Sequence, residues 1–322
     1  MATYLGTHGG KIQTYSTDPT YPNTGEVWYN STSNTIKMEA TTSAGAWATG
    51  GALNQFRDQA AGSGTQTSTL VFGGGPPNQD KTESYNGSNW TEMNDLNTAR
   101  RGIAGAGADN TSALAFGGGS PGVDVTESWN GSNWTEVNDL NTARYFLGGT
   151  GIITAALAYG GTGGSSATES WNGTNWTTVN SLNTGRDAPA SAGIQTSALC
   201  IGGSPPVTAK TELWNGTNWT EVNALNTARV GAGGAGASNT SAIAFGGGVP
   251  YPSAPPPTVP TTKTEEWNGT NWTETTDLAT GRAYIAGSGT KTAALSSGGS
   301  DTTNTEEWTG AGAPVVKTID TD

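Results

Sequence analysis

The fold of this chain is decided by the stretch Thr126-Glu-Ser-Trp-Asn-Gly-Ser-Asn-Trp-Thr-Glu-Val-Asn-Asp-Leu-Asn-Thr-Ala-Arg144, which recurs along the sequence. Close copies begin at Thr82, Thr168, Thr211 and Thr264, with a truncated copy at Thr305. The second Trp of the unit falls at Trp47, Trp90, Trp134, Trp176, Trp219 and Trp272, with spacings of 43, 44, 42, 43 and 53 residues. A repeat of this length predicts a β-propeller in which each unit forms one four-stranded blade.

Turn signals divide each unit into four short strands. The first strand follows an Arg and is rich in Gly and Ala, as in Arg101–Gly107, and small side chains suit the crowded centre of a propeller. The second strand is apolar and ends in Gly-Gly, and the third ends at a Trp followed by Asn-Gly, a strong hairpin signal. We predict that the two aromatic residues of each unit pack between neighbouring blades, where burial of an indole is strongly favourable.

One Arg and one Glu also recur once in each unit. Their equal numbers and fixed spacing predict structural ion pairs in preference to a catalytic set. The arginines are Arg57, Arg100, Arg144, Arg186, Arg229 and Arg282, and the glutamates are Glu83, Glu127, Glu169, Glu212, Glu265 and Glu306.

The two ends of the repeat region predict how the ring closes. The last unit, at Thr305, has no second Trp strand after it, whereas the segment around Trp47 supplies such a strand before any Gly-Gly strand. We expect the Trp47 strand to complete the last blade, because this removes the exposed edges of an open array. The predicted fold is therefore all-β: an N-terminal arm (1–45), a six-bladed propeller (46–310) and a C-terminal tail (311–322).

The Gly-Gly strand end, the aromatic pair and the blade-crossing Arg together resemble Kelch repeats over roughly residues 46–310. Trp129 and Trp134 stand slightly closer together than the aromatic pair of Kelch repeats, which affects the length of the hairpin between them. Some Kelch-type propellers are copper oxidases whose site is built on two His and Tyr ligands. That site does not carry over to this sequence, because His8 is the only histidine and lies outside the repeats.

The N-terminal segment Asn23–Met38, with Gly-Glu-Val-Trp-Tyr-Asn at its centre, resembles a short β-hairpin common in tailed-phage fibre and other virion proteins. The Trp-Asn-Gly-Thr-Asn-Trp-Thr units look like Kelch-like virion proteins of marine bacteriophages. The resemblance implies a structural protein located in the virion, as a tail fibre or a capsid decoration. Residues 1–45 would then be the attachment arm, and the partners would be other virion proteins and a host-surface glycan or receptor.

Charge and composition exclude several classes of function. The formal net charge is −12 and no run of Lys and Arg is present, so we expect no nucleic-acid binding. No apolar stretch is long enough to cross a bilayer, and Met1–Lys11 lacks the apolar core of a signal peptide, so neither membrane insertion nor a cleaved leader is expected. Cys200 is the only cysteine and stands where Ala115 stands in another unit, so we predict a small buried core residue.

A search for catalytic chemistry finds no complete set of residues. Zinc sites and nucleophilic triads need His or Cys clusters that the repeats lack. The adjacent pairs Glu265-Glu266 and Glu306-Glu307 are expected to diverge, because neighbours on a strand point to opposite faces. We therefore expect a protein without enzymatic activity, cofactor or metal, although calcium at Asn- and Asp-rich turns stays open.

The units vary most in the connection between the second and third strands. In the fifth unit this connection expands into a proline-rich loop that includes Pro250 and Tyr251, and in the second unit it contains Asp124. We predict that these residues contact a partner, because loops on a rigid scaffold commonly carry recognition, and that the Asn-Gly turns lie on the opposite face. A stiff spacer without a partner is an equal alternative for the proline-rich loop. A propeller lectin that stacks sugars on exposed Trp is the alternative function, and an oligomer is compatible with both.

Overall fold

The computed structural model describes residues 12–19, 26–41, 44–250, 258–312 and 314–319 of the chain. The chain divides into two compact units, one formed by Ala46–Thr309 and the other by Met1–Gly45 together with Gly310–Asp322. The regular structure of the described residues consists of β-strands, so the prediction of an all-β chain is confirmed.

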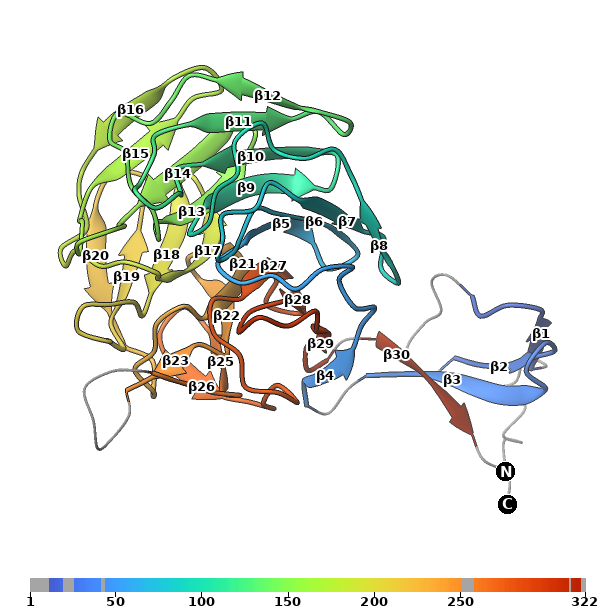
Figure 1. The fold of residues 1–322 in the computed structure, drawn as a ribbon. Helices are drawn as coiled ribbons and strands as arrows, with labels where there is room; N and C mark the ends of the chain where they lie inside the picture. The colour runs from blue at the N-terminus through green and yellow to red at the C-terminus, as the bar shows by residue number, and fades with distance from the viewer. Residues whose placement is uncertain (1–11, 20–25, 42–43, 251–257, 313, 320–322) are drawn as a thin grey trace. The chain divides into compact units, whose positions relative to one another are not determined.

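The larger unit is a six-bladed β-propeller, as predicted. Each blade is a four-stranded antiparallel sheet, and the first strands of successive blades are neighbours around the axis (Figure 1). Blades 1 and 2 comprise β5 (Ala61–Thr65), β6 (Ser68–Phe72), β7 (Thr82–Tyr85), β8 (Trp90–Glu92), and β9 (Ala104–Asp109), β10 (Ser112–Phe116), β11 (Thr126–Trp129), β12 (Trp134–Val137). Blades 3 and 4 comprise β13 (Gly148–Ile152), β14 (Ala155–Tyr159), β15 (Thr168–Trp171), β16 (Trp176–Val179), and β17 (Ala190–Ile194), β18 (Ser197–Ile201), β19 (Thr211–Trp214), β20 (Trp219–Val222). Blade 5 comprises β21 (Gly233–Ser238), β22 (Ser241–Phe245), β25 (Thr264–Trp267) and β26 (Trp272–Glu274).

Blade 6 is assembled from both ends of the propeller sequence. Its strands are β27 (Ala286–Thr290), β28 (Ala293–Ser297), β29 (Thr305–Thr309) and β4 (Ala46–Thr49). Strand β4 pairs antiparallel with β29, and Trp47 lies opposite Trp308. The predicted closure of the ring by the strand around Trp47 is therefore confirmed.

The third and fourth strands of a blade are joined by a four-residue loop and not by a two-residue turn. In blade 2, Trp129 pairs with Trp134, and the side-chain oxygen of Asn130 accepts the N–H groups of Ser132 and Asn133 at 3.0 and 2.9 Å. Gly131 in this loop has a φ of +90°, which explains the glycine of the repeated Asn-Gly. The loop thus owes its shape to an Asx turn at Asn130.

The aromatic residues of the unit pack each blade against the preceding one. The Trp176 ring meets Phe116 of the preceding blade at a centroid distance of 4.9 Å, and its Nε1 donates to Thr126 Oγ1 of that blade at 3.1 Å. In blade 6, where the two ends of the propeller sequence meet at the seam of the ring, Trp47 makes the same two interactions with Phe245 and Thr264 of blade 5. Similar interfaces thus recur around the propeller, each with a Trp of one blade packed against the preceding blade.

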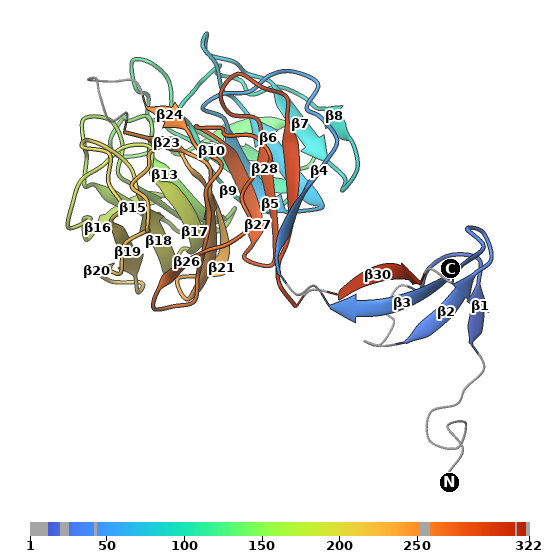
Figure 2. The same ribbon diagram turned by 90° about the horizontal axis from the view of Figure 1, so that it is seen from below.

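The smaller unit is a four-stranded sheet in the order β1 (Gln13–Tyr15), β2 (Val27–Asn30), β3 (Thr35–Thr41) and β30 (Pro314–Ile319) (Figure 2). Strands β2 and β3 form the expected hairpin. Within the C-terminal tail expected at 311–322, Pro314–Ile319 forms β30, which pairs antiparallel with β3. The physical reason is that β3 would otherwise present an unpaired edge. The arm is therefore built from both ends of the chain, with the propeller inserted between β3 and β30.

Candidate binding surfaces

The recurrent Arg and Glu side chains lie inside the blades. Arg100 Nη2 donates to Glu127 Oε1 at 2.8 Å, and its Nη1 donates to the carbonyl oxygens of Gly117 and Val125 at 2.9 and 2.6 Å. The other pairs are Arg57–Glu83, Arg144–Glu169, Arg186–Glu212, Arg229–Glu265 and Arg282–Glu306. All twelve side chains are buried, so none of them forms part of the exposed surface.

The Trp side chains are also committed to the interior. Eleven of the twelve are at most 7% exposed, and Trp47 is half-buried against Trp308. None of the twelve Trp rings is therefore exposed in the way that sugar stacking by a lectin would require.

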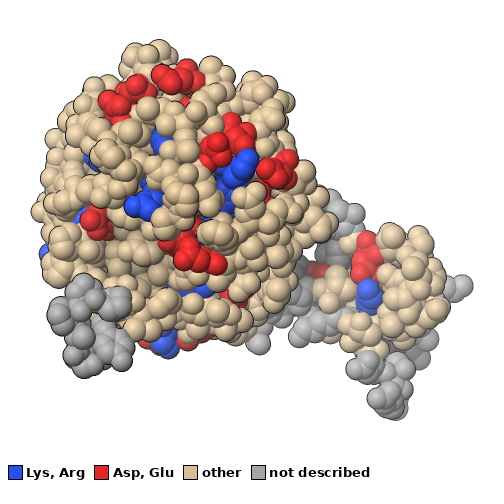
Figure 3. Space-filling view, viewed as in Figure 1, with Lys and Arg blue, Asp and Glu red and all other residues tan. Residues whose placement is uncertain are grey.

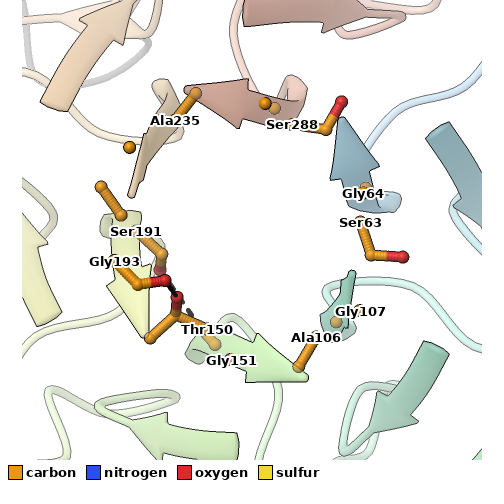
Figure 4. A pocket seen from close by; sticks show the side chains of 18 of the residues that line it. Ser63, Gly64, Ala106, Gly107, Thr150, Gly151, Ser191, Gly193, Ala235 and Ser288 are labelled. Atoms are coloured by element: carbon orange, nitrogen blue, oxygen red, sulfur yellow. Dashed lines mark hydrogen bonds between the residues drawn. The ribbon is translucent and has the colours of Figure 1, made fainter. Parts of the chain in front are cut away.

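The first strands of the blades surround an axial channel. One part of this channel, with a volume of about 180 Å³, is lined mostly by Gly and other small residues, including Ser63, Ala106, Thr150 and Ser288, together with two isoleucines (Figure 4). Thr150 donates its hydroxyl to the carbonyl of Gly193 on the next blade, which links the walls of the channel. This lining carries no ionisable side chain, so its polar groups are backbone groups and hydroxyls.

A closed ring of six backbone hydrogen bonds surrounds the axis at the end of the channel where the first strands begin. Each blade donates one N–H to the carbonyl of the preceding blade, with distances of 2.6 to 3.2 Å. The six residues all have positive φ, between +44° and +62°, and are Gln59, Gly102, Phe146, Ala188, Gly231 and Tyr284. Sequence reasoning missed this ring, because these positions share no residue type.

Aromatic and acidic side chains lie at this ring. Phe146 and Tyr284, from opposite blades, have ring centroids 5.6 Å apart. Burial raises the pKa of the Asp58 carboxyl to about 6, although Gln59 and Ser300 donate hydrogen bonds to it. Burial raises the pKa of Tyr284 as well, and the negative charges of Asp58 and Asp187 add to that effect. The centre of this face therefore combines an aromatic pair with acidic groups.

The loops predicted to vary lie on the same face as the blade crossings, as expected. In blade 2, Leu140 N and Arg144 N of the crossing segment donate to the carbonyls of Asp124 and Val123 in the variable loop. In blade 5, the loop begins and ends in a short ladder of β23 (Gly248–Val249) and β24 (Val259–Pro260).

The predicted contact residues belong to different blades. Asp124 and Pro250 are both exposed, but they belong to blades 2 and 5, which stand opposite each other in a six-membered ring. Tyr251, the third predicted contact residue, lies outside the described residues.

The lone cysteine and the adjacent glutamates are not arranged for catalysis. Cys200 is fully buried, and burial raises the pKa of its thiol to about 12, which leaves it in the unreactive thiol form. Glu265 pairs with Arg229 inside the blade, whereas the neighbouring Glu266 lies 3.4 Å from Lys291, so the two carboxylates diverge as expected.

Across the ranges that the structure describes, no group of three His, Cys, Asp or Glu side chains is arranged to hold a metal ion. Nor does any helix in those ranges have the length and apolar character needed to span a bilayer. The surface seen in Figure 3 is largely uncharged, with acidic and basic side chains in small separate groups.

Comparison with known proteins gives no assignment. No protein-family model matches the chain, and no curated protein is significantly similar to it.

Proposed function

We propose that this chain is a non-enzymatic structural protein of a bacteriophage particle, a Kelch-like propeller held by its arm on the tail, fibre or capsid. The arm contacts other virion proteins, and the face of variable loops contacts a further protein or a host-surface receptor. The hairpin and repeat resemblances described above support the placement in a virion.

The proposal rests on the position at which the propeller is connected to the arm. In five blades, the third and fourth strands are joined at their aromatic pair by the Asn-Gly loop. In blade 6 that loop is missing: the chain enters the propeller from the arm at Ala46 and passes back into the arm after Thr309. The variable loops leave the opposite ends of these blades. A protein tethered at one face and varied at the other is suited to display its varied face.

Two variants and the wild-type protein test the proposal in the phage that encodes the chain. Mass spectrometry of purified particles should detect the wild-type protein, and deletion of residues 250–261 should leave its incorporation unchanged while reducing adsorption to the host. Trp28→Ala should instead reduce incorporation, because Trp28 is the fully buried centre of the arm, where its Nε1 donates to Asp18. Absence of the protein from purified particles would refute the assignment, and normal adsorption after the loop deletion would refute the role of that loop.

A glycan-binding propeller is the second candidate, favoured by the aromatic pair Phe146 and Tyr284 beside Asp58 and Asp187. Aromatic rings next to carboxylates suit sugar recognition, in which C–H groups stack on rings and hydroxyls donate to acids. A glycan array separates the two functions. Two results together would favour the lectin: glycan binding that is lost in Tyr284→Ala, and absence of the protein from purified particles.

A further inference from the structure

A side-chain amide accompanies the buried Arg–Glu pair in five of the six blades. In blade 2, Asn97 donates its backbone N–H and its Nδ2 to Glu127 Oε2 at 2.7 and 2.8 Å. The same Nδ2 also donates to the carbonyl of Trp134 at 3.1 Å. The equivalent pairs are Asn54–Glu83, Asn141–Glu169, Asn183–Glu212 and Asn226–Glu265. A primary amide thus bridges the carboxylate and a strand carbonyl at each of these sites.

Blade 6 lacks this amide, because Ala279 stands where the other units have Asn. Glu306 Oε2 accepts the backbone N–H of Ala279 at 2.8 Å, but Ala279 has no side-chain donor to offer. Arg282 still occupies Oε1 and also donates to Ser296. The Glu306 residue is 4% exposed, whereas the five other glutamates are at most 1% exposed. Glu306 is therefore buried like the others, but slightly more exposed.

A cavity lies at this place in the seam. Its volume is about 210 Å³, far above the roughly 15 Å³ that one water molecule requires. Glu306 lies in its wall, together with Gly50 from the closing segment and with Ala279 and Thr280 from the blade crossing. Because Ala279 and Thr280 are exposed, a ligand can enter from solvent.

We propose that this seam cavity binds a primary carboxamide, such as the side chain of Asn or Gln on a partner segment. The five intact blades define the chemistry, since each holds an amide NH₂ against the carboxylate. A neutral amide preserves the balance of the Arg282–Glu306 pair, whereas a carboxylate would be repelled by Glu306 and an ammonium by Arg282. This site is independent of the proposed role in a particle, because the repeat itself supplies its chemistry.

The test titrates the full-length protein with acetamide and follows the backbone amide signals of Ala279 and Glu306 by NMR. We expect saturable shifts with a Kd on the order of 10 mM, as suits so small a ligand. N,N-dimethylacetamide has no N–H and acetate is negatively charged, so both should bind at least 10-fold more weakly. Equal binding of acetamide and dimethylacetamide, or the absence of a saturable shift, would overturn the proposal.

Two variants serve as matched controls. Ala279→Asn restores the repeat, so it should abolish the acetamide response and raise the Tm. Asn226→Ala should create a second site with the same preference at Glu265. An unchanged acetamide response in Ala279→Asn, or no new site in a folded Asn226→Ala protein, would refute the inference.

Two sources of the amide are separated by a peptide pair. Saturable binding of Gly-Asn-Gly but not of Gly-Asp-Gly identifies a side chain of a partner segment. Binding of acetamide alone identifies a free small amide as the ligand.

Discussion

Replacing Arg229 with Met tests whether the recurrent ion pairs stabilise the fold. Arg229 and Glu265 are both 0% exposed. Arg229 donates to Glu265 and to the carbonyls of Gly246 and Lys263, and its bond to the Lys263 carbonyl measures 2.6 Å. Met keeps much of the apolar stem but removes the guanidinium. Glu265 is then left as a buried carboxylate with only the amide groups of Asn226 as donors.

The expected loss is large on the scale of a single substitution. Breaking a buried pair by removing one partner costs about 3–5 kcal/mol, because the remaining charge is uncompensated. We expect Arg229→Met to lower the free energy of unfolding by about 4 kcal/mol. For a domain of this size, such a loss corresponds to a fall in Tm of about 8–16 °C, measured by thermal denaturation at pH 7.

Two further variants make this prediction refutable. Glu265→Gln in the Arg229→Met background removes the stranded charge, so the double variant should regain at least about 1 kcal/mol. Lys263→Met breaks an ion pair with Glu274 whose side chains are 40% and 49% exposed, and should cost less than about 1 kcal/mol. If Arg229→Met costs no more than Lys263→Met, or if Glu265→Gln rescues nothing, the pair does not stabilise the blade.

Two more predictions concern the axial face. Burial raises the pKa of Asp58 to about 6, above its unfolded value of about 3.9, so the contribution of Asp58 to stability falls as the pH rises from about 4 to about 6. In urea unfolding, Asp58→Asn should therefore raise the free energy of unfolding by about 3 kcal/mol more at pH 7 than at pH 4. An increase that does not depend on pH would contradict this. A Cβ on Gly231, at φ +62°, would lie 3.0 Å from Tyr284 N, so Gly231→Ala should lower stability by about 2 kcal/mol. Ala188→Gly in the same ring should not lower it, because Ala188 already adopts a φ of +44°; the reverse order of the two Tm changes would show that the ring does not require these conformations.

The blades and their closure were predictable because the information is local and repeated. Gly-Gly, the aromatic pair and the Arg mark the strands in each unit, and the missing strand after Thr305 matches the spare strand at Trp47. Pairing of Pro314–Ile319 with β3 was not predictable, since this strand occurs once and has no repeat to identify it.

The axial ring and the seam cavity depend on tertiary geometry. The hydrogen bond from Gln59 N to Tyr284 O exists only when the first and last blades meet, and neither residue type indicates a positive φ. Ala279 was visible as a departure from the repeated Asn. The cavity that results could not be predicted, because it also depends on the register of β4 against β29, which brings Gly50 beside Glu306.

The departures from the repeat at the seam form a consistent set. Tyr85 stands where the other units have Trp, and its hydroxyl donates to Glu307 across the seam. Gly50 stands where other units have Val, Met or Thr, and a Cβ there would lie 3.1 Å from the Tyr85 hydroxyl. A larger residue at position 50 would therefore displace this hydrogen bond. Blade 6 thus differs in its closing strand, its junction with the arm and its amide site. Because each blade contacts mainly its two neighbours, these features can change without disturbing the packing of blades 2 to 4.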